Sequence, residues 1–330
     1  MGTLLQENVI LDDLKNACKN QLGMDILSAE PIRRGWLNLK WRIHTKDGVF
    51  LLKQYNKERL KKYSIPALQR IFAEQNNLHR QGFPCPKIIA NQDNLFLESP
   101  LGERFMVMEY CSGKTVEPGK LSNAELYELG YYTGKLHALW EELPLAPQTT
   151  FQPPKTSLRI AYWEKVIEAA KNMGKSHLLP ILEKQLRLTK SFPLENLNLD
   201  AVGWSHRDLW VDNLLFDQGK LTAILDFDRM NYDFPQLDVA RAIISGALNE
   251  DKLNVQGAFA FLNGYRFYHS IGSDFLPNAL KLLWYMESEW WLDTELDARK
   301  GPPKRFVQEM VWLSDHLHEL DTILGNYEGG

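Results

Sequence analysis

The sequence has few cysteines, no basic excess and no long apolar run, and each absence excludes a class of protein. Its three cysteines, Cys18, Cys85 and Cys111, stand far apart and lack paired metal-binding spacing, so neither a disulfide framework nor a zinc site is expected. The formal net charge is −4 and the isoelectric point is near 6.1. This charge balance gives no attraction to nucleic acid or to an anionic membrane.

Membrane insertion is also not expected. No segment approaches the roughly 20 apolar residues that a spanning helix needs, and the first ten residues carry Glu7 and no signal-length apolar run. We therefore expect a cytoplasmic protein. At 330 residues the chain is long enough for two domains or two lobes of one enzyme. Nothing in the sequence indicates its oligomeric state.

The chain does contain a polar run typical of phosphoryl transfer from ATP, which reads His206-Arg207-Asp208-Leu209-Trp210-Val211-Asp212-Asn213. In this interpretation Asp208 is the catalytic base beside the attacking hydroxyl. Asn213 and the later Asp226 are the magnesium ligands. A single carboxylate of this kind is ordinarily a turn or helix-cap residue, so the prediction depends on the order and spacing of all three.

The segment between Asn213 and Asp226 predicts a β-hairpin. Residues 214–216 and 221–225 are apolar and flank the turn Asp217-Gln218-Gly219-Lys220. A hairpin brings the residues before its first strand and after its second strand to one end. The spacing therefore predicts that Asp208, Asn213 and Asp226 meet there.

The N-terminal part predicts a helix over residues 9–22 and a small sheet within residues 24–55. Gly35 and Asn38 fall between the first two predicted strands, where a glycine lets the backbone approach a phosphate. A turn at Lys46-Asp47-Gly48 precedes the strand 49–55, which carries Lys53 among apolar residues. We expect Gly35, Asn38 and Lys53 to contact ATP.

The burial of Lys53 requires a partner, and the next helix supplies a candidate. Pro66 opens that helix, an apolar stripe follows it at 3.6-residue spacing, and Glu74 lies on the flank of the stripe. A Lys53–Glu74 ion pair would satisfy both charges and direct the lysine at the α and β phosphates. In the alternative, Lys53 reaches solvent from an edge strand and Glu74 is solvated.

A boundary between two lobes is predicted near residue 110. Residues 104–110 form an apolar strand that ends before Gly113, and backbone groups at Glu109, Tyr110 and Cys111 are placed to bind the adenine edge. We therefore expect a nucleotide-binding lobe over 1–110 and a catalytic and substrate-binding lobe over 111–330. A capping box at residues 122–125 opens a helix that carries His137, which we interpret as packed.

These residues resemble the aminoglycoside phosphotransferase and choline kinase superfamily, most of all its homoserine-kinase-like and bacterial spore-coat kinase-like branches. The resemblance runs from about residue 32 to 265, and the matching positions are Gly35, Asn38, Lys53, Glu74, residues 106–113, residues 206–213, Asp226 and residues 235–240. It implies an α+β, two-lobed protein-kinase-like fold, with an antiparallel sheet and a helix in the N-lobe and a mainly helical C-lobe. It also implies ATP and Mg²⁺ as cofactors, and His206 and Asp238 as structural supports of the catalytic loop.

Two positions depart from the family pattern. Arg207 stands where many members have Gly, Ala or Asn, and Arg34 stands where a second glycine is common. Arg207 and Leu209 make the loop similar to that of protein kinases. However, Asp226 is followed by Phe227-Asp228 and not by Phe-Gly, and no Ala-Pro-Glu occurs. The acceptor is therefore expected to be a small molecule.

Residues 284–295 predict a helix whose face carries Trp284, Glu287, Trp291 and Glu295. Aromatic rings with carboxylates bind organic cations, although the same pattern fits a core helix. No arginine occurs from residue 267 to 298, which disfavours recognition of the homoserine carboxylate. The expected acceptor is thus an amino alcohol or amino sugar, with Asp228 as a further metal or substrate contact.

The sequence therefore predicts an ATP-dependent small-molecule kinase with an alcohol acceptor. Because spore-coat relatives serve as assembly components, a catalytically weak or inert structural protein of the spore coat is the alternative. Homoserine kinase-like or protein kinase activity comes third.

Overall fold

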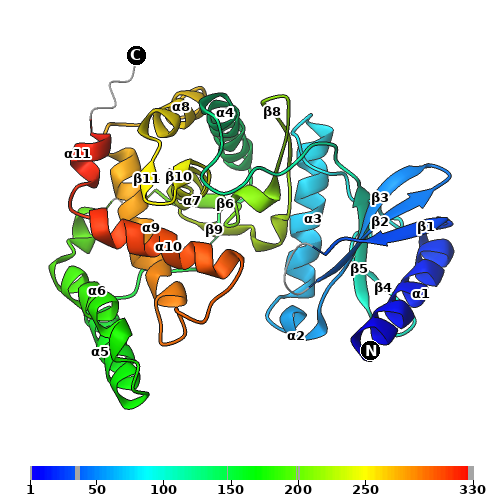
Figure 1. Ribbon diagram of the computed structural model, residues 1–330. Helices are drawn as coiled ribbons and strands as arrows, with labels where there is room; N and C mark the ends of the chain where they lie inside the picture. The colour runs from blue at the N-terminus through cyan, green and yellow to red at the C-terminus, as the bar shows by residue number, and fades with distance from the viewer. Residues whose placement is uncertain (1, 34–37, 147, 198, 200, 326–330) are drawn as a thin grey trace. The chain divides into compact units, whose positions relative to one another are not determined.

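The computed structural model describes residues 2–33, 38–146, 148–197, 199 and 201–325. The chain divides into two compact units (Figure 1). The first comprises residues 1–114 and 222–228, and the second comprises residues 115–221 and 229–330. Among helices in the described ranges, none combines the length and apolar character needed to cross a bilayer.

The first unit is built on a five-stranded antiparallel sheet with the strand order β1-β2-β3-β5-β4. Its strands are β1 (Ser28–Pro31), β2 (Leu39–Thr45), β3 (Gly48–Gln54), β4 (Leu97–Glu98) and β5 (Arg104–Glu109). Its helices are α1 (Gly2–Leu22), α2 (Lys57–Leu60) and α3 (Ile65–Arg80). The small sheet predicted for the N-terminal part is confirmed, and the N-terminal helix begins earlier than residue 9.

The two faces of this sheet are covered by different helices, α1 and α3 (Figure 1). Along β5, Phe105 and Val107 pack with the α1 side chains, while Met106 and Met108 pack with the α3 side chains. This follows from the alternation of side chains along a strand. Leu52 of β3 belongs to the α1 side, so its neighbour Lys53 lies on the α3 face.

Helix α3 begins and packs as its sequence predicts. The Ser64 hydroxyl accepts a hydrogen bond from the Ala67 N–H at 3.4 Å, and Pro66 stands in the first turn. Leu68, Phe72 and other stripe residues are buried against the sheet. The prediction of a proline-opened amphipathic helix is confirmed.

The second unit is mainly helical. Its helices are α4 (Asn123–Trp140), α5 (Thr156–Asn172), η1 (Ser176–Leu178), α6 (Leu179–Ser191), η2 (Leu194–Asn196), η3 (Val211–Asn213), α7 (Gln236–Ala247), α8 (Val255–Tyr265), α9 (Phe275–Trp291), α10 (Pro302–His316) and α11 (Leu320–Leu324). Its short strand pairs are β6 (Gly203–Ser205) with β9 (Asn231–Asp233), and β10 (Leu248–Asn249) with β11 (Lys252–Leu253). The capping box at the start of α4 is confirmed.

The hairpin predicted after the polar loop is present as β7 (Leu214–Asp217) and β8 (Lys220–Ile224). Gln218 and Gly219 in its turn have φ angles of 49° and 80°. Two consecutive positive φ angles are typical of the two-residue hairpin turn that matches strand twist. The short helix η4 (Phe227–Arg229) follows β8.

Helices α4 and α8 contact each other through glycines. A Cβ atom on Gly130 would lie 1.9 Å from the Phe261 carbonyl oxygen, and one on Gly264 would lie 2.2 Å from the Tyr127 carbonyl oxygen. Neither position can hold a larger residue without moving a helix. This contact fixes α4, and with it the buried His137.

Candidate active site

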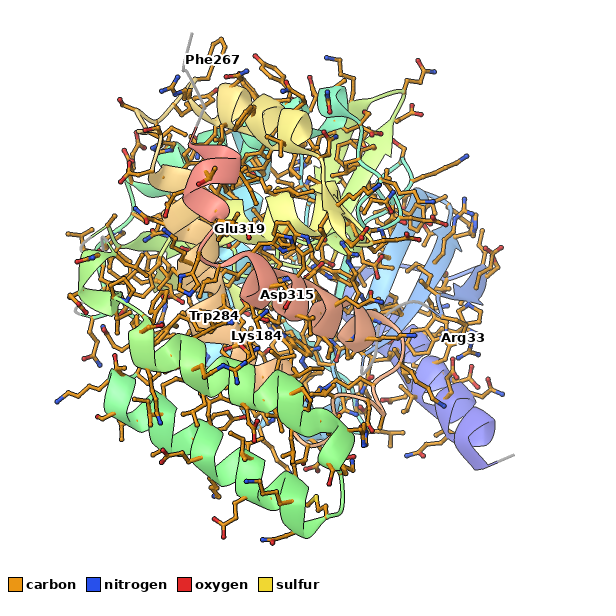
Figure 2. The ribbon with its side chains drawn as sticks, turned by 60° about the vertical axis from the view of Figure 1, so that its left-hand side comes forward. Arg33, Lys184, Phe267, Trp284, Asp315 and Glu319 are labelled. Carbon is orange, nitrogen blue, oxygen red and sulfur yellow. The ribbon has the colours of Figure 1, made fainter. Side chains whose placement is uncertain are left out.

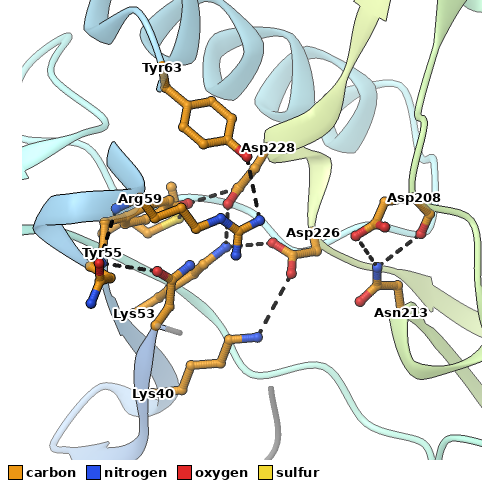
Figure 3. A network of polar contacts seen from close by, with 12 residues as sticks. Lys40, Lys53, Tyr55, Arg59, Tyr63, Asp208, Asn213, Asp226 and Asp228 are labelled. Atoms are coloured by element: carbon orange, nitrogen blue, oxygen red, sulfur yellow. Dashed lines mark hydrogen bonds and ion pairs between the residues drawn. The ribbon is translucent and has the colours of Figure 1, made fainter. Parts of the chain in front are cut away.

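The predicted site residues form two networks of polar contacts, one in each unit (Figure 3). The first network joins Lys53 to Asp226 and Asp228. The second joins Asp208 to Asn213 in the loop after β6. Ion pairs between side chains hold the first network together, whereas the second is closed by hydrogen bonds within its loop.

In the first unit, Lys53 is the centre of a buried charge cluster. Its side chain is 3% exposed, and its Nζ lies 2.5 Å from Asp226 Oδ1 and 2.8 Å from Asp228 Oδ2. The Tyr55 hydroxyl donates to the other oxygen of Asp228 at 2.8 Å. Burial alone lowers the pKa of Lys53, but the two carboxylates outweigh it and hold that pKa well above its ordinary value.

Asp226 remains charged for the same reason. Burial raises the pKa of Asp226, but the Lys53 ammonium lowers it further, and the net result lies below the ordinary value. Burial and the charge of Asp228 raise the pKa of the Tyr55 hydroxyl well above its ordinary value, so Tyr55 stays a hydrogen-bond donor. The cluster is therefore one cation shared by two carboxylates.

The structure gives Lys53 two acidic partners that the sequence analysis did not predict. The ammonium pairs with Asp226 and Asp228, whereas the Glu74 carboxylate accepts from the Asn77 amide at 3.3 Å. Both acids follow β8, whose Ile224 N–H donates to the Pro84 carbonyl at 2.8 Å. That contact anchors the end of β8 within the first unit, where Asp226 and Asp228 pair with the Lys53 ammonium.

Two residues of this cluster were missed by the sequence analysis. Tyr55 stands two positions after Lys53, so the alternation of the strand was the available signal. Lys40 is the register partner of Lys53 across β2 and β3, and its Nζ lies 3.9 Å from Asp226 Oδ2. Lys40 adds a second ammonium beside the predicted magnesium ligand.

The remaining predicted ATP contacts lie around the same sheet. The Asn38 side chain accepts from the Asn56 N–H at 3.0 Å and so ties the start of β2 to α2. Glu109 ends β5, and the Tyr110 N–H contacts the Val49 carbonyl at 3.4 Å. The Cys111 thiol is partly buried. Gly35 lies outside the described residues. The role of these residues in binding adenine or phosphate remains a prediction.

In the second unit, the loop carrying Asp208 is closed by Asn213. The Asn213 amide donates to the Asp208 carbonyl and to its carboxylate Oδ2, both at 2.9 Å. Its own amide oxygen is therefore directed away from Asp208. The Arg229 guanidinium lies 3.5 Å from the other Asp208 oxygen. Asp208 thus keeps a fixed orientation beside a half-exposed cation.

Asp238 holds the backbone of this loop. Its two carboxylate oxygens accept the His206 N–H at 2.6 Å and the Arg207 N–H at 2.7 Å. His137 Nε2 lies 3.2 Å from the oxygen that binds His206. Burial raises the pKa of Asp238, but the His137 hydrogen bond and nearby positive charge lower it below its ordinary value. Its role as a support of a catalytic loop remains a prediction.

Helix α7 holds the loop at a second point. The Ser245 hydroxyl accepts the Val211 N–H at 3.1 Å, seven residues after Asp238 and on the same face of the helix. The sequence analysis missed Ser245, although the seven-residue spacing was a usable signal. One helix thus anchors both ends of the segment that carries Asp208.

Arg207 has a strained backbone. Its φ of 63° is unusual for a residue with a side chain, and its guanidinium pairs with the fully buried Asp233 at 3.1 Å. Burial raises the pKa of Asp233 to about 6, and Arg207 only partly opposes this. Arg207, which departs from the family pattern, thus has a buried acidic partner for its side chain.

The residues predicted to form a substrate-binding face on α9 have other contacts in the structure. Trp284, labelled in Figure 2, is 1% exposed. Its indole N–H donates to Gln185 of α6 at 2.8 Å. Glu287 is paired with Arg241. Helix α9 ends at Trp291, so Glu295 does not continue its face. The core-helix alternative describes Trp284, and Arg241 already neutralises Glu287.

The donor atoms fit a hard divalent cation. Asp226 supplies a charged carboxylate and Asn213 an amide oxygen, which are ligands that magnesium accepts. Within the described residues, no group of three or more His, Cys, Asp or Glu side chains could hold a metal. Magnesium binding by these two residues remains a prediction.

Comparisons with known proteins identify a family and relatives that this chain resembles. The profile of the phosphotransferase enzyme family matches residues 28–271. Homoserine kinase of Afipia carboxidovorans is 27% identical over 261 residues, which cover 78% of this chain and 76% of that protein.

Solved structures share the fold. Choline kinase from Cryptosporidium parvum aligns with a TM-score of 0.60 at 15% identity over 95% of this chain and 98% of that one. A spectinomycin phosphotransferase bound to ADP and spectinomycin aligns with a TM-score of 0.59 at 13% identity over 96% and 98% of the two chains. The predicted resemblance and the two-lobed protein-kinase-like fold are confirmed.

Proposed function

This chain belongs to the phosphotransferase enzyme family, and from that premise we propose that it transfers the γ-phosphoryl group of ATP to the hydroxyl of a small amine-bearing alcohol. The observation that carries the proposal is the loop in which Asn213 orients Asp208 while Asp238 holds the backbone. A carboxylate fixed in this way can receive a proton without reorganising during the reaction.

The chemical step assigns one role to each group. The acceptor oxygen bonds to the γ-phosphorus as the bond from that phosphorus to the β-γ bridging oxygen breaks, and the hydroxyl proton passes to Asp208. Lys53 and Lys40 supply positive charge for the phosphates. When bound at Asn213 and Asp226, magnesium would neutralise phosphate charge. Asp228 and Tyr55 keep the Lys53 ammonium in place.

Homoserine is a second candidate acceptor, because it is an amino alcohol that also carries a carboxylate. Two observations support it: the homoserine kinase relatives, and the half-exposed Arg229 beside Asp208. The lack of arginine in residues 267–298 is weak as an objection, because Arg241 and Arg159 reach α9 from other helices, where they bind Glu287 and Glu289. An arginine from another helix can therefore reach a ligand bound near α9, although residues 267–298 contain none.

The test is ADP release by the full chain with ATP and magnesium, over homoserine, small amino alcohols, amino sugars and aminoglycosides. We expect one acceptor class to stimulate ADP release well above the rate without acceptor. Stimulation by homoserine alone would select the second candidate. Nucleotide binding without stimulation by any acceptor would contradict the proposal and favour the structural spore-coat alternative.

The assignment of the base is tested by Asp208→Asn, with Asp217→Asn as the matched control in the exposed hairpin turn. We expect Asp208→Asn to lower turnover by about 10²- to 10⁴-fold and to keep ATP affinity within about threefold of the wild type. Asp217→Asn should behave as the wild type. Normal turnover of Asp208→Asn would reject Asp208 as the base.

A further inference from the structure

A cavity in the second unit has no part in the proposed reaction. Its volume is about 510 Å³, which is within the range of sites for metabolite-sized ligands. Its walls come from the C-terminal part of α4, from β6 and β9, and from α9 and the segment before it. They include Glu141, Trp204, Tyr232 and Asp274. Neither Asp208 nor Asn213 lines it.

The lining has the chemistry of a site for an organic cation. Among the described residues, the lining includes the carboxylates of Glu141 and Asp274 and no lysine or arginine. Trp204, Tyr232 and Tyr265 supply aromatic surface. The lining residue His269 lies 3.6 Å from Glu141. Burial lowers the pKa of His269, so this histidine does not neutralise Glu141 at neutral pH. Aromatic faces beside uncompensated carboxylates attract protonated amines.

One wall of the cavity is connected by hydrogen bonds to the loop that carries Asp208. The lining residues His137 and Tyr265 are hydrogen-bonded to each other at 3.0 Å. His137 also bonds Asp238, which accepts the N–H groups of His206 and Arg207. A ligand that packs against His137 therefore contacts the support of the loop through one intervening side chain.

We propose that this cavity binds a small protonated amine with an aromatic or aliphatic body, and that its occupancy stabilises the loop at residues 206–208. The amine lies near Glu141 and Asp274, and the apolar body packs on the aromatic walls. Only an effect of this ligand on the reaction at Asp208 rests on the proposed function. Binding itself and its effect on the loop backbone are independent of it.

The probe is tryptamine, with tryptophol as its uncharged analogue and indole-3-acetate as its anionic one. Calorimetric titration of the full chain without nucleotide should give binding of tryptamine, about tenfold weaker binding of tryptophol, and the weakest binding for the anion. Absence of tryptamine binding, or equal affinity for tryptamine and tryptophol, would overturn the proposed ligand chemistry.

A double variant locates the site. Glu141→Gln with Asp274→Asn removes both cavity carboxylates, and Glu117→Gln with Glu164→Gln removes two exposed ones elsewhere in the second unit. We expect about tenfold weaker tryptamine binding in the first variant and unchanged affinity in the second. Equal affinity in both variants would assign the probe to another surface and refute the proposal.

Hydrogen exchange tests the link to the loop. Saturating tryptamine should slow amide exchange at His206 and Arg207, because both N–H groups are bound by Asp238. The cavity double variant should show no such slowing at the same tryptamine concentration. Tryptamine that binds without changing exchange at these amides would overturn the link. The same exchange measurement on Asp208→Asn separates this inference from the proposed function. If tryptamine slows exchange at His206 and Arg207 in that variant, the link between cavity and loop holds even if the proposed function fails.

Discussion

The two polar networks hold their carboxylates in different ways. Asp226 and Asp228 are bound by another side chain, the Lys53 ammonium. Asp238 is bound by two backbone N–H groups and a histidine. A side-chain partner can move or exchange partners, whereas a backbone N–H stays in place and becomes unsatisfied when its acceptor is lost. We therefore expect losses in the first network to appear in ligand binding and losses in the second to appear in folding stability.

The largest effect on ligand binding is expected from Asp226→Asn. The change removes the charge of a proposed magnesium ligand, so magnesium-dependent nucleotide affinity should fall by about 10- to 100-fold. Calorimetric titration of ATP with and without magnesium measures it. Affinity without magnesium should change much less. Equal losses under both conditions would mean that Asp226 acts on the fold and not through a metal.

A large effect on stability is expected from Asp238→Asn. Both Asp238 oxygens accept hydrogen bonds, and an amide NH₂ cannot accept, so one loop N–H would face another donor. The free energy of unfolding should fall by about 3–5 kcal/mol, as measured by chemical denaturation.

Asp228→Asn is the matched variant in the first network. The Tyr55 hydroxyl can rotate, and Lys53 keeps Asp226, so the loss of stability should be about half as large or less. Equal losses in the two variants would remove the distinction between side-chain and backbone partners.

The same distinction explains what the sequence could and could not predict. The capping box of α4, the proline at the start of α3 and the turn of the β7–β8 hairpin are local signals, and each element formed where its signal lies. The loop around Asp208 is likewise closed by Asn213, five residues away. Short-range patterns of this kind are set by a few neighbouring residues.

Long-range partners were not predictable from local pattern. Lys53 binds acids 173 and 175 residues away, and Trp284 binds Gln185, 99 residues away. The heptad-like pattern of Trp284, Glu287 and Trp291 could not show that Arg241 of another helix neutralises Glu287. Spacing identifies which side chains share a face, and tertiary packing decides what that face contacts.

A smaller effect is expected from the pH dependence of Asp233. Its pKa is raised to about 6 in the fold, against about 3.9 in an unfolded chain. Between these values the folded state binds more protons, so the contribution of Asp233 is favourable below about pH 4 and is lost as pH rises through 6. The loss is at most about 3 kcal/mol.

The measurement compares unfolding free energies at pH 4 and pH 7 for the wild type, Asp233→Asn and the exposed control Asp217→Asn. The wild type and Asp217→Asn should lose the same increment between the two conditions, and Asp233→Asn should lose less. A variant at position 233 that follows the wild-type profile would show that this carboxyl titrates normally in the fold.

The smallest effect is expected from Tyr55→Phe, which removes one hydrogen bond to Asp228 and keeps the ring 4.6 Å from the Lys53 ammonium. Stability should fall by about 1 kcal/mol, and turnover should fall less than tenfold because Lys53 retains both carboxylates. The exposed Tyr127→Phe is the control for loss of a hydroxyl. A fall in magnesium-dependent nucleotide affinity as large as that of Asp226→Asn would instead make Tyr55 essential for the cluster, and the first network would then be as intolerant of a lost partner as the second.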